Sequence, residues 1–341
     1  MFTSGTSAPD ASPEREMLRL TSGHLTAQAL RVFASLGLPD ILREGPKSAA
    51  DLALATKSDA TTLFRTLRFL ATIDIVKRDE NGEFSLTRLG RTLCKRPNPV
   101  IHDNTLLACS ALHWTAIGNL LHAVKTGENA FRAIHGKAYF ESLGENPEEA
   151  GIFNAAMNSA SQIGIGAILA AYDFSAFRSV VDVAGGEGAL LRGILARHKH
   201  VRGILFDATD AIEQQVPDEM VADRLTTIRG DFFSCVPPGA DAYLLRRILH
   251  NWNDQEAITI LRQCRGAMPR SSKLLIIELA APQPGDSGFD WAFLDMLMML
   301  INGGRERSLH EFEQILEAAG FSCPRVILTR SPYWILESAP A

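Results

Sequence analysis

Three side chains in the C-terminal half of the chain have the chemistry of a general base supported by acids: His250, Glu278 and Glu306. His250 follows a predicted strand at 240–245, and Glu278 ends the next predicted strand, at 273–277. A histidine with a reference pKa of about 6.5 can take a proton from an acidic hydroxyl, and it needs a hydrogen-bonded partner to fix its tautomer. We therefore expect His250 to be the base, Glu278 its partner and Glu306 a second partner.

The elements that must position these groups form an α/β pattern from Tyr172 onward. Predicted strands alternate with predicted helices, which is typical of a doubly wound sheet whose ligands bind outside the carboxyl ends of the strands. Asp207 and Asp231 fall just beyond strand ends. His250 and Glu278 do the same, so we expect all four groups to share one crevice. The predicted strands cover 180–183, 202–206, 225–228, 240–245, 273–277, 325–328 and 333–336, the last two as a hairpin, and the predicted helices end near Arg197, Glu213, Met268 and Ala319.

A glycine-rich turn follows the first of these strands. Gly185, Gly186 and Gly188 stand between the strand at 180–183 and a helical pattern. Strand, glycine turn and helix are the start of a nucleotide-binding βαβ unit, in which a ligand approaches the backbone closely. Asp207 ends the next strand, where an acid accepts hydrogen bonds from ribose hydroxyls.

The residues around this turn discriminate between nucleotides. A dinucleotide fingerprint requires a third glycine where this chain has Leu191, which disfavours an NAD-dependent dehydrogenase. Asp182 precedes the turn, and an acid there suits a cationic ligand better than a phosphate. The pattern resembles the first motif of S-adenosylmethionine (SAM) methyltransferases, with Ala184 in place of the usual first glycine.

The N-terminal part of the chain has the pattern of a winged helix-turn-helix. Helices are predicted at 18–36, 49–56 and 61–73, and a hairpin at 75–86 turns through Asn81-Gly82. This shape is common in DNA-binding regulators, but residues 1–103 hold fourteen Lys/Arg and twelve Asp/Glu, a balance of only +2. A DNA-binding face carries a clear basic excess, so we favour a subunit contact and expect no nucleic-acid partner.

Length and composition limit the remaining classes. The 341 residues suffice for two domains, and the net charge is −5. Five cysteines without CxxC spacing disfavour a zinc site or a disulfide framework, so we expect no metal and a reducing, cytoplasmic location. We expect no membrane span, because no apolar run of about 18 residues occurs. Residues 1–16 are polar, are interpreted as a flexible tail and lack the apolar core of a signal peptide.

From residue 17 onward the chain resembles the plant caffeic-acid-type and bacterial small-molecule O-methyltransferases. The matching motifs occur in the order and spacing of that family. Ala184 is a departure within the glycine turn; it adds a methyl group but does not argue against cofactor binding. The motifs are Phe-Asn-Ala-Ala-Met at 153–157, Asp-Val-Ala-Gly-Gly-Glu-Gly at 182–188, Gly-Asp-Phe-Phe at 230–233, Leu-His-Asn-Trp at 249–252, Ile-Glu at 277–278 and Gly-Gly-Arg-Glu-Arg at 303–307.

The resemblance implies a domain plan and a cofactor. A winged-helix dimerisation domain at 17–103 would precede a helical connector at 104–170, which contributes to the substrate pocket, and a SAM-binding Rossmann-like domain at 171–341. It implies a homodimer and a catalytic set of His250, Glu278 and Glu306. The implied cofactor contacts are Asp182, Gly185, Gly186, Gly188, Asp207, Asp231, Phe232, Arg246, Trp252 and Ser161.

The acceptor is less constrained than the cofactor. Large apolar groups with helical spacing favour a flat aromatic acceptor, such as a phenol or an aromatic polyketide. The presence of both glutamates beside His250 favours transfer to an acidic hydroxyl. The alternatives are a ring-nitrogen acceptor, or a relative that keeps SAM without transferring its methyl group. The candidate pocket walls are Trp114, Phe140, Phe153, Met157, Phe289, Met298 and Asn302.

Overall fold

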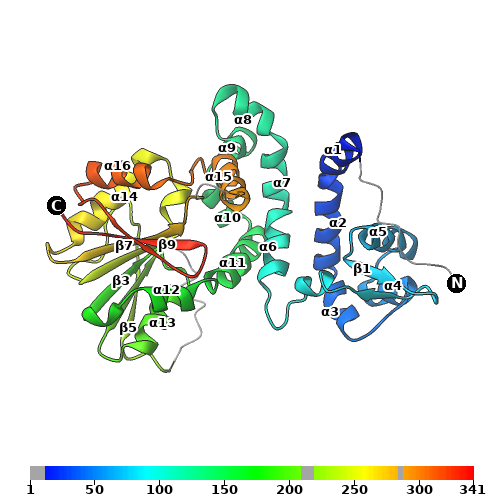
Figure 1. Cartoon of the computed structure of the whole chain (residues 1–341), viewed down its shortest axis with the longest axis horizontal. Coiled ribbons are helices and arrows are strands. Elements are labelled where there is room, and N and C mark those ends of the chain that lie inside the picture. Colours follow the sequence, from blue (N-terminus) through cyan, green and yellow to red (C-terminus); the bar gives the residue numbers. More distant parts are fainter. Residues whose placement is uncertain (1–11, 209–218, 283–286) are drawn as a thin grey trace. The chain divides into compact units, whose positions relative to one another are not determined.

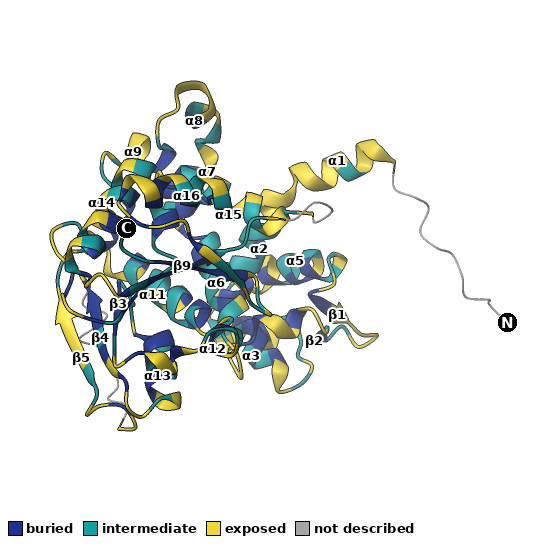
Figure 2. Cartoon of the chain, turned by 60° about the vertical axis from the view of Figure 1, so that its left-hand side comes forward, coloured by how far each residue is buried: buried dark blue, intermediate teal, exposed yellow. Residues whose placement is uncertain are grey.

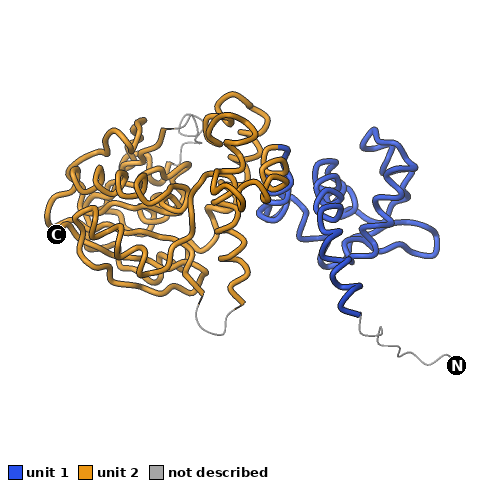
Figure 3. The backbone as a smooth tube through the Cα atoms, turned by 90° about the horizontal axis from the view of Figure 1, so that it is seen from above, with its two compact units in different colours: residues 1–111 blue, residues 112–341 orange. Residues whose placement is uncertain are grey.

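The computed structural model describes residues 12–208, 219–282 and 287–341, and it divides into two compact units (Figure 3). Unit 1 ends at Ala111, and unit 2 runs from Leu112 to Ala341. We expected the first domain to end at residue 103. The boundary follows Ala111 because α6 (Val100–Ala108) packs against α2 (Gly23–Ser35) of unit 1.

Unit 1 has the helices and the hairpin of a winged helix around one apolar core. Phe33, Leu67 and Phe84 are fully buried in it. Ser48 accepts the Asp51 N–H and so caps α4, which confirms the predicted start of that helix. The other elements are α3 (Leu38–Arg43), α4 (Ala49–Thr56), α5 (Ala60–Thr72), β1 (Val76–Arg78), β2 (Phe84–Leu86) and the 3₁₀ turn Gly90–Leu93; β1 and β2 pair antiparallel.

The beginning of unit 1 corrects two expectations. Helix α1 (Pro13–Thr21) takes up the end of the segment that we interpreted as a tail, because Pro13 suits the first turn of a helix. The single helix predicted at 18–36 is two helices, since the Ser22 hydroxyl donates to the Arg19 carbonyl and Gly23 weakens helix continuity. Gly37 ends α2 in a left-handed conformation, as expected, but α3 then starts at once.

Unit 2 begins with a set of helices in the region of the helical connector that the resemblance implies at 104–170. Asn146 caps α11 and Pro147 occupies its first turn, which explains the break after α10. The helices are α7 (Ala111–Gly118), α8 (Leu120–Thr126), α9 (Ala130–His135), α10 (Tyr139–Glu145), α11 (Pro147–Ser161) and α12 (Ile165–Ala171).

A seven-stranded sheet forms the centre of unit 2, in the order β5-β4-β3-β6-β7-β9-β8 (Figure 1). The five strands from β5 to β7 are parallel, and β9 runs antiparallel to both of its neighbours. Figure 2 shows the inner strands as buried and β5 as an exposed edge. The strands are β3 (Ser179–Val183), β4 (Arg202–Asp207), β5 (Leu225–Arg229), β6 (Ala242–Arg246), β7 (Lys273–Leu279), β8 (Arg325–Leu328) and β9 (Tyr333–Ser338).

Helices cover both faces of this sheet, so the fold is Rossmann-like and doubly wound, as predicted. One apolar core contains residues of α14 (Asp254–Ala267) and α16 (Leu309–Ala318), and the other contains residues of α12 and α13 (Ala189–Arg197). Valine and isoleucine side chains alternate between these two cores along the strands.

Several features of unit 2 lie outside the predicted pattern. The hairpin β8–β9 is confirmed, but β9 inserts between β7 and β8. Helix α15 (Phe289–Ile301) occurs where we expected no element. The helix predicted after Asp207 lies outside the described residues. Within the described ranges, every helix is too short or too polar to span a membrane.

Candidate active site

His250 lies in a buried 3₁₀ turn, Leu249–Asn251, directly beyond β6. Its Nδ1 atom is 2.6 Å from Oε1 of Glu306, and both side chains are buried. With the carboxylate accepting the proton on Nδ1, the lone pair of the ring lies on Nε2. The structure thus gives Glu306 the place of direct partner, which we expected Glu278 to hold.

Glu278 supports the same turn through the backbone. Its Oε1 atom accepts the N–H groups of Ile248 at 3.1 Å and Leu249 at 3.0 Å. Among the described residues, its Oε2 atom has no hydrogen-bond partner. Burial disfavours the charged form and raises the pKa of Glu278 to about 7, although the nearby His250 acts in the opposite direction.

These groups form one cluster at the carboxyl edge of the sheet. One ligand atom from each of His250, Glu278 and Glu306 lies within 4.8 Å of the others. A set of one imidazole and two carboxylates has the composition of a base with its acids, and also that of a cation site. The expected absence of a metal therefore stays a prediction.

The glycine turn beyond β3 is tied to the end of β4. Gly186 donates its N–H to Oδ2 of Asp207 at 2.8 Å. Ala184 has a φ of +56°, so a residue with a side chain adopts the left-handed conformation that glycine adopts without strain. A Cβ at Gly185 would lie 2.6 Å from Cγ of Asp182, so only glycine fits there.

Asp182 lies on β3, under this turn. Its side chain is buried, and burial raises the pKa of its carboxyl group to about 7; nearby Arg246 acts in the opposite direction. Arg246 donates to the main-chain oxygens of Ser161 and Ile163, both at 2.7 Å, and so fixes the end of α11 to the end of β6. The Ser161 hydroxyl itself donates to the Asn158 carbonyl.

Aromatic side chains gather around Trp252, two residues after His250. The Trp252 ring meets the Phe232 ring edge-on at a centroid distance of 5.9 Å. The Phe140 ring stacks on the Trp252 ring at 6.0 Å. Asp231, beside Phe232, accepts the Phe233 N–H and the Ser234 hydroxyl, both at 2.9 Å. A predicted cofactor contact and a predicted pocket wall thus share one ring stack.

The pocket walls predicted on α10 and α11 also meet. The Phe140 and Phe153 rings are 5.9 Å apart, and Tyr139 contacts both. The Tyr139 hydroxyl lies 3.2 Å from Nε2 of His113, whose pKa burial lowers to about 4. Sequence reasoning missed Tyr139 and His113, because their helical spacing marks them only as core positions.

The other predicted walls lie in different surroundings. Met298 is buried on α15, and Asn302 at its end donates to Oδ1 of Asn251 at 2.7 Å, next to His250. Phe289, the first residue of α15, is 70% exposed and stacks on Phe293. A helix rises about 1.5 Å per residue, so Phe289 and Asn302 lie at opposite ends of α15. Trp114 and Met157 are half-buried on α7 and α11, and their role stays a prediction.

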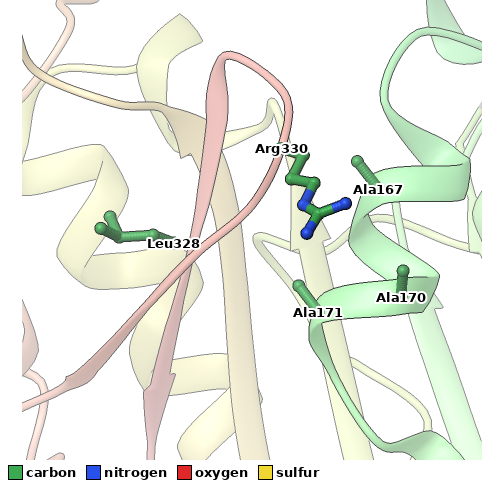
Figure 4. Close-up of a pocket in the computed structure, with 5 residues that line it drawn as sticks. All are labelled: Ala167, Ala170, Ala171, Leu328 and Arg330. Atoms are coloured by element: carbon green, nitrogen blue, oxygen red, sulfur yellow. The ribbon is translucent and has the colours of Figure 1, made fainter.

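A separate pocket of about 400 Å³ lies between α12 and the β8–β9 hairpin (Figure 4). Its lining residues are Ala167, Ala170, Ala171, Leu328 and Arg330. None of them belongs to the predicted site, and small alanines beside one arginine give the pocket few groups for chemistry.

The fold and the site together define an enzyme class. The Rossmann-like sheet carries three features at one edge: the glycine turn, Asp207 at the end of the next strand, and the buried pair of His250 and Glu306. Together they define a SAM-dependent methyltransferase. The chain belongs to the O-methyltransferase family: the family's O-methyltransferase domain matches residues 117–322 and its dimerisation domain matches residues 18–96. It is an O-methyltransferase whose cofactor is SAM.

The most similar proteins include bacterial enzymes of secondary metabolism. The chain is 37% identical over 333 residues to phenazine O-methyltransferase PhzM of Lysobacter antibioticus, covering 95% of both chains. The structure of the mitomycin 7-O-methyltransferase MmcR matches with a TM-score of 0.91 at 33% identity, over 98% of this chain and 100% of that one. An O-methyltransferase from neocarzinostatin biosynthesis, solved with S-adenosylhomocysteine and 1,4-dihydroxy-2-naphthoic acid, matches with a TM-score of 0.80 at 30% identity, over 93% and 96%.

The residues at the glycine turn fit this cofactor. No described atom lies within 4 Å of a Cβ built at Gly186, so a ligand can approach the backbone there. The Trp252 and Phe232 rings offer flat apolar surfaces beside the turn of His250. Buried Asp182 provides a carboxyl group that a cationic ligand would favour in its charged form.

Proposed function

We propose that this enzyme transfers the methyl group of SAM to a hydroxyl of an aromatic secondary metabolite, such as a phenol or an aromatic polyketide, with His250 as the general base. The observation that carries the proposal is the buried 2.6 Å contact between His250 and Glu306. SAM, when bound, supplies an electrophilic methyl group on a sulfonium.

In this reaction the protein's own residues take the proton from the acceptor hydroxyl. Nε2 of His250 takes the hydroxyl proton, and Glu306 accepts the Nδ1–H and stabilises the imidazolium that forms. A phenol with a pKa near 10 is only slightly ionised at neutral pH, and a positioned base contributes about 10²–10⁴-fold to the rate. Glu278 keeps the turn in place through the N–H groups of Ile248 and Leu249.

The aromatic class of the acceptor is supported by the ring group beside His250. The Phe140 ring contacts the rings of Tyr139, Phe153 and Trp252 at centroid distances of 5.7, 5.9 and 6.0 Å. The named substrates of the relatives, a phenazine and a naphthoic acid, are aromatic as well. Flat rings suit stacking on such surfaces, so we propose an aromatic acceptor for this chain too.

The proposal is tested by incubating the enzyme with labelled SAM and a panel of phenols, N-heterocycles and aromatic polyketides, followed by mass spectrometry. We expect the label on a hydroxyl oxygen. Label on a ring nitrogen would favour the N-methyltransferase alternative. Consumption of an acceptor without transfer of label would favour a relative that keeps SAM for other chemistry.

Addition of EDTA should leave the rate of methyl transfer unchanged. A rate that depends on a metal would assign the cluster of His250, Glu278 and Glu306 a different role.

The base is tested by His250→Ala. Loss of the imidazole removes general-base assistance, so we expect turnover to fall by at least about 100-fold. SAM affinity in calorimetry should stay within a few-fold, because His250 is not among the expected cofactor contacts. A variant with wild-type turnover would exclude His250 from the mechanism.

We further propose a homodimer formed through the N-terminal unit and its neighbouring helices, which the dimerisation-domain match to residues 18–96 supports.

A cytoplasmic location is favoured by the two exposed free thiols, Cys235 and Cys323. We expect no nucleic-acid partner, and a gel shift with duplex DNA at physiological salt would test that expectation.

A further inference from the structure

Arg307 is a fully buried arginine whose donors converge on the turn that carries His250. Nη1 donates to the Leu249 carbonyl at 2.8 Å, and Nη2 donates to the Trp252 carbonyl at 2.8 Å. Nε and Nη2 also donate to Oδ1 of Asp254, at 3.0 and 2.8 Å. The two carbonyls stand on either side of His250, so one planar guanidinium brackets the histidine along the backbone.

The same turn is held from other directions as well. The Arg305 N–H donates to the His250 carbonyl at 2.9 Å, and Glu278 accepts the N–H groups at the start of the turn. Arg247, just before the turn, has a φ of +55°, a conformation that residues with side chains rarely adopt. Such a conformation persists only where the surroundings hold it, and Arg307 supplies side-chain bonds on the far side of the turn.

We propose that Arg307 is a positioning residue: it holds the Leu249–Asn251 turn so that His250 meets Glu306, while Asp254 orients its guanidinium. The inference rests on the proposed function, because Arg307 acts through His250. Arginine suits this role because its rigid fork donates to several acceptors at fixed angles, whereas lysine is a single flexible ammonium group.

The charge of Arg307 argues against a role in packing alone. Moving a guanidinium out of water is costly, and an apolar side chain of similar volume would fill the same space at lower cost. The paired carboxylate of Asp254 is itself 46% exposed, so it compensates this charge only in part. The other hydrogen bonds of Arg307 go to the main-chain carbonyls of Leu249 and Trp252, which are the groups that need to be held.

The test compares Arg307→Lys and Asp254→Ala with the wild-type enzyme by hydrogen exchange and mass spectrometry. Amides 248–252 should exchange at least about ten-fold faster in both variants, while β7 keeps its protection. The matched control is Arg224→Lys, which removes a partly buried arginine that also donates to main-chain carbonyls, those of Leu195, His198, Val201 and Met220 at the opposite edge of the sheet. Unchanged exchange at 248–252 in both variants would overturn the proposal. Asp254 is half-exposed, so its variant keeps the test valid if Arg307→Lys does not fold.

A kinetic cycle separates positioning from general damage. In the wild-type background each variant should lower kcat at least about ten-fold, with the acceptor KM within about three-fold. In the His250→Ala background the same change should lower kcat less than about two-fold, because the residue that it positions is gone. Equal losses in both backgrounds would overturn a role through His250. If His250→Ala alone leaves kcat unchanged, the proposed base fails, yet the exchange data still decide whether Arg307 holds the turn.

Discussion

The carboxyl group of Asp182 is held in a buried position that raises its pKa from 3.8 to about 7. Between those pH values the folded chain keeps a proton that the unfolded chain has released. Stability therefore falls as pH rises through this window, since the unfolded state binds fewer protons than the folded state. A carboxylate in a salt bridge has a lowered pKa, so its contribution makes stability rise with pH instead.

Replacing Asp182 by asparagine removes this titration and keeps the shape of the side chain. We expect the free energy of unfolding of the wild-type protein to fall more steeply from pH 5 to 7.5 than that of Asp182→Asn, by at least about 1.4 kcal/mol. Urea titrations of the cofactor-free proteins at a series of pH values measure both curves. Glu278 titrates in both proteins and cancels from the difference. Parallel curves would show that Asp182 does not carry the effect.

For single residues, the sequence predicted which side chains lie together, but it did not predict correctly which of them are joined by hydrogen bonds. His250 and Glu278 were expected together because strand ends share an edge, and they do lie together, with Glu306 beside them. The order of the partners differed, since Glu306 follows α15 and no strand pattern sets the path of that segment. Main-chain acceptors for Arg307 depend on atomic geometry that residue types and spacing do not contain.

Among the elements, those with a clear period or cap were predicted and those without were missed. Parallel strands with β-branched residues and the capped helix α4 matched expectation. Helix α15 is apolar apart from Asp290 and Asp295, so its amphipathic period is weak, and only residues near its end are buried. The insertion of β9 between β7 and β8 depends on long-range pairing that hairpin signals do not reveal.

The turn after α15 approaches the His250 turn so closely that it admits only glycine at position 304. A Cβ there would lie 2.1 Å from the His250 carbonyl oxygen and 2.4 Å from the Asn251 carbonyl carbon. These are backbone atoms, which cannot rotate away as a side-chain tip does. Gly304 therefore sets the separation between the segment that carries Glu306 and the turn that carries His250.

We expect Gly304→Ala to push the two segments apart and to lower kcat at least about 100-fold, as misplacements of about 1 Å do. The matched control is Gly151→Ala on α11, where a Cβ meets no described atom within 4 Å. That variant should keep wild-type turnover and gain slightly in stability, because alanine favours helix more than glycine does. Steady-state kinetics and thermal unfolding of both variants decide; a fully active Gly304→Ala enzyme would contradict the steric argument.

At the scale of the whole molecule, α1 exposes apolar side chains that the described part of the single chain does not bury. In the described part of the chain it buries none of its residues, and Met17, Leu18 and Leu20 are 59%, 69% and 59% exposed. Soluble proteins rarely expose neighbouring large apolar side chains unless another surface covers them. The dimerisation-domain match begins at residue 18, within this helix. These observations together favour a second copy of the chain as the covering surface.

The dimer is tested by placing charges in that surface. The wild-type protein should elute with a mass of about 74 kDa, twice the 37.2 kDa of one chain, in size-exclusion chromatography with light scattering. Leu18→Glu combined with Leu20→Glu should give the mass of one chain, because a buried charge without a partner is strongly unfavourable at an interface. Leu328→Glu, at a residue that is 75% exposed in unit 2, is the matched control and should leave the mass at twice that of one chain. A double variant that remains dimeric with unchanged mass would place the interface elsewhere than α1.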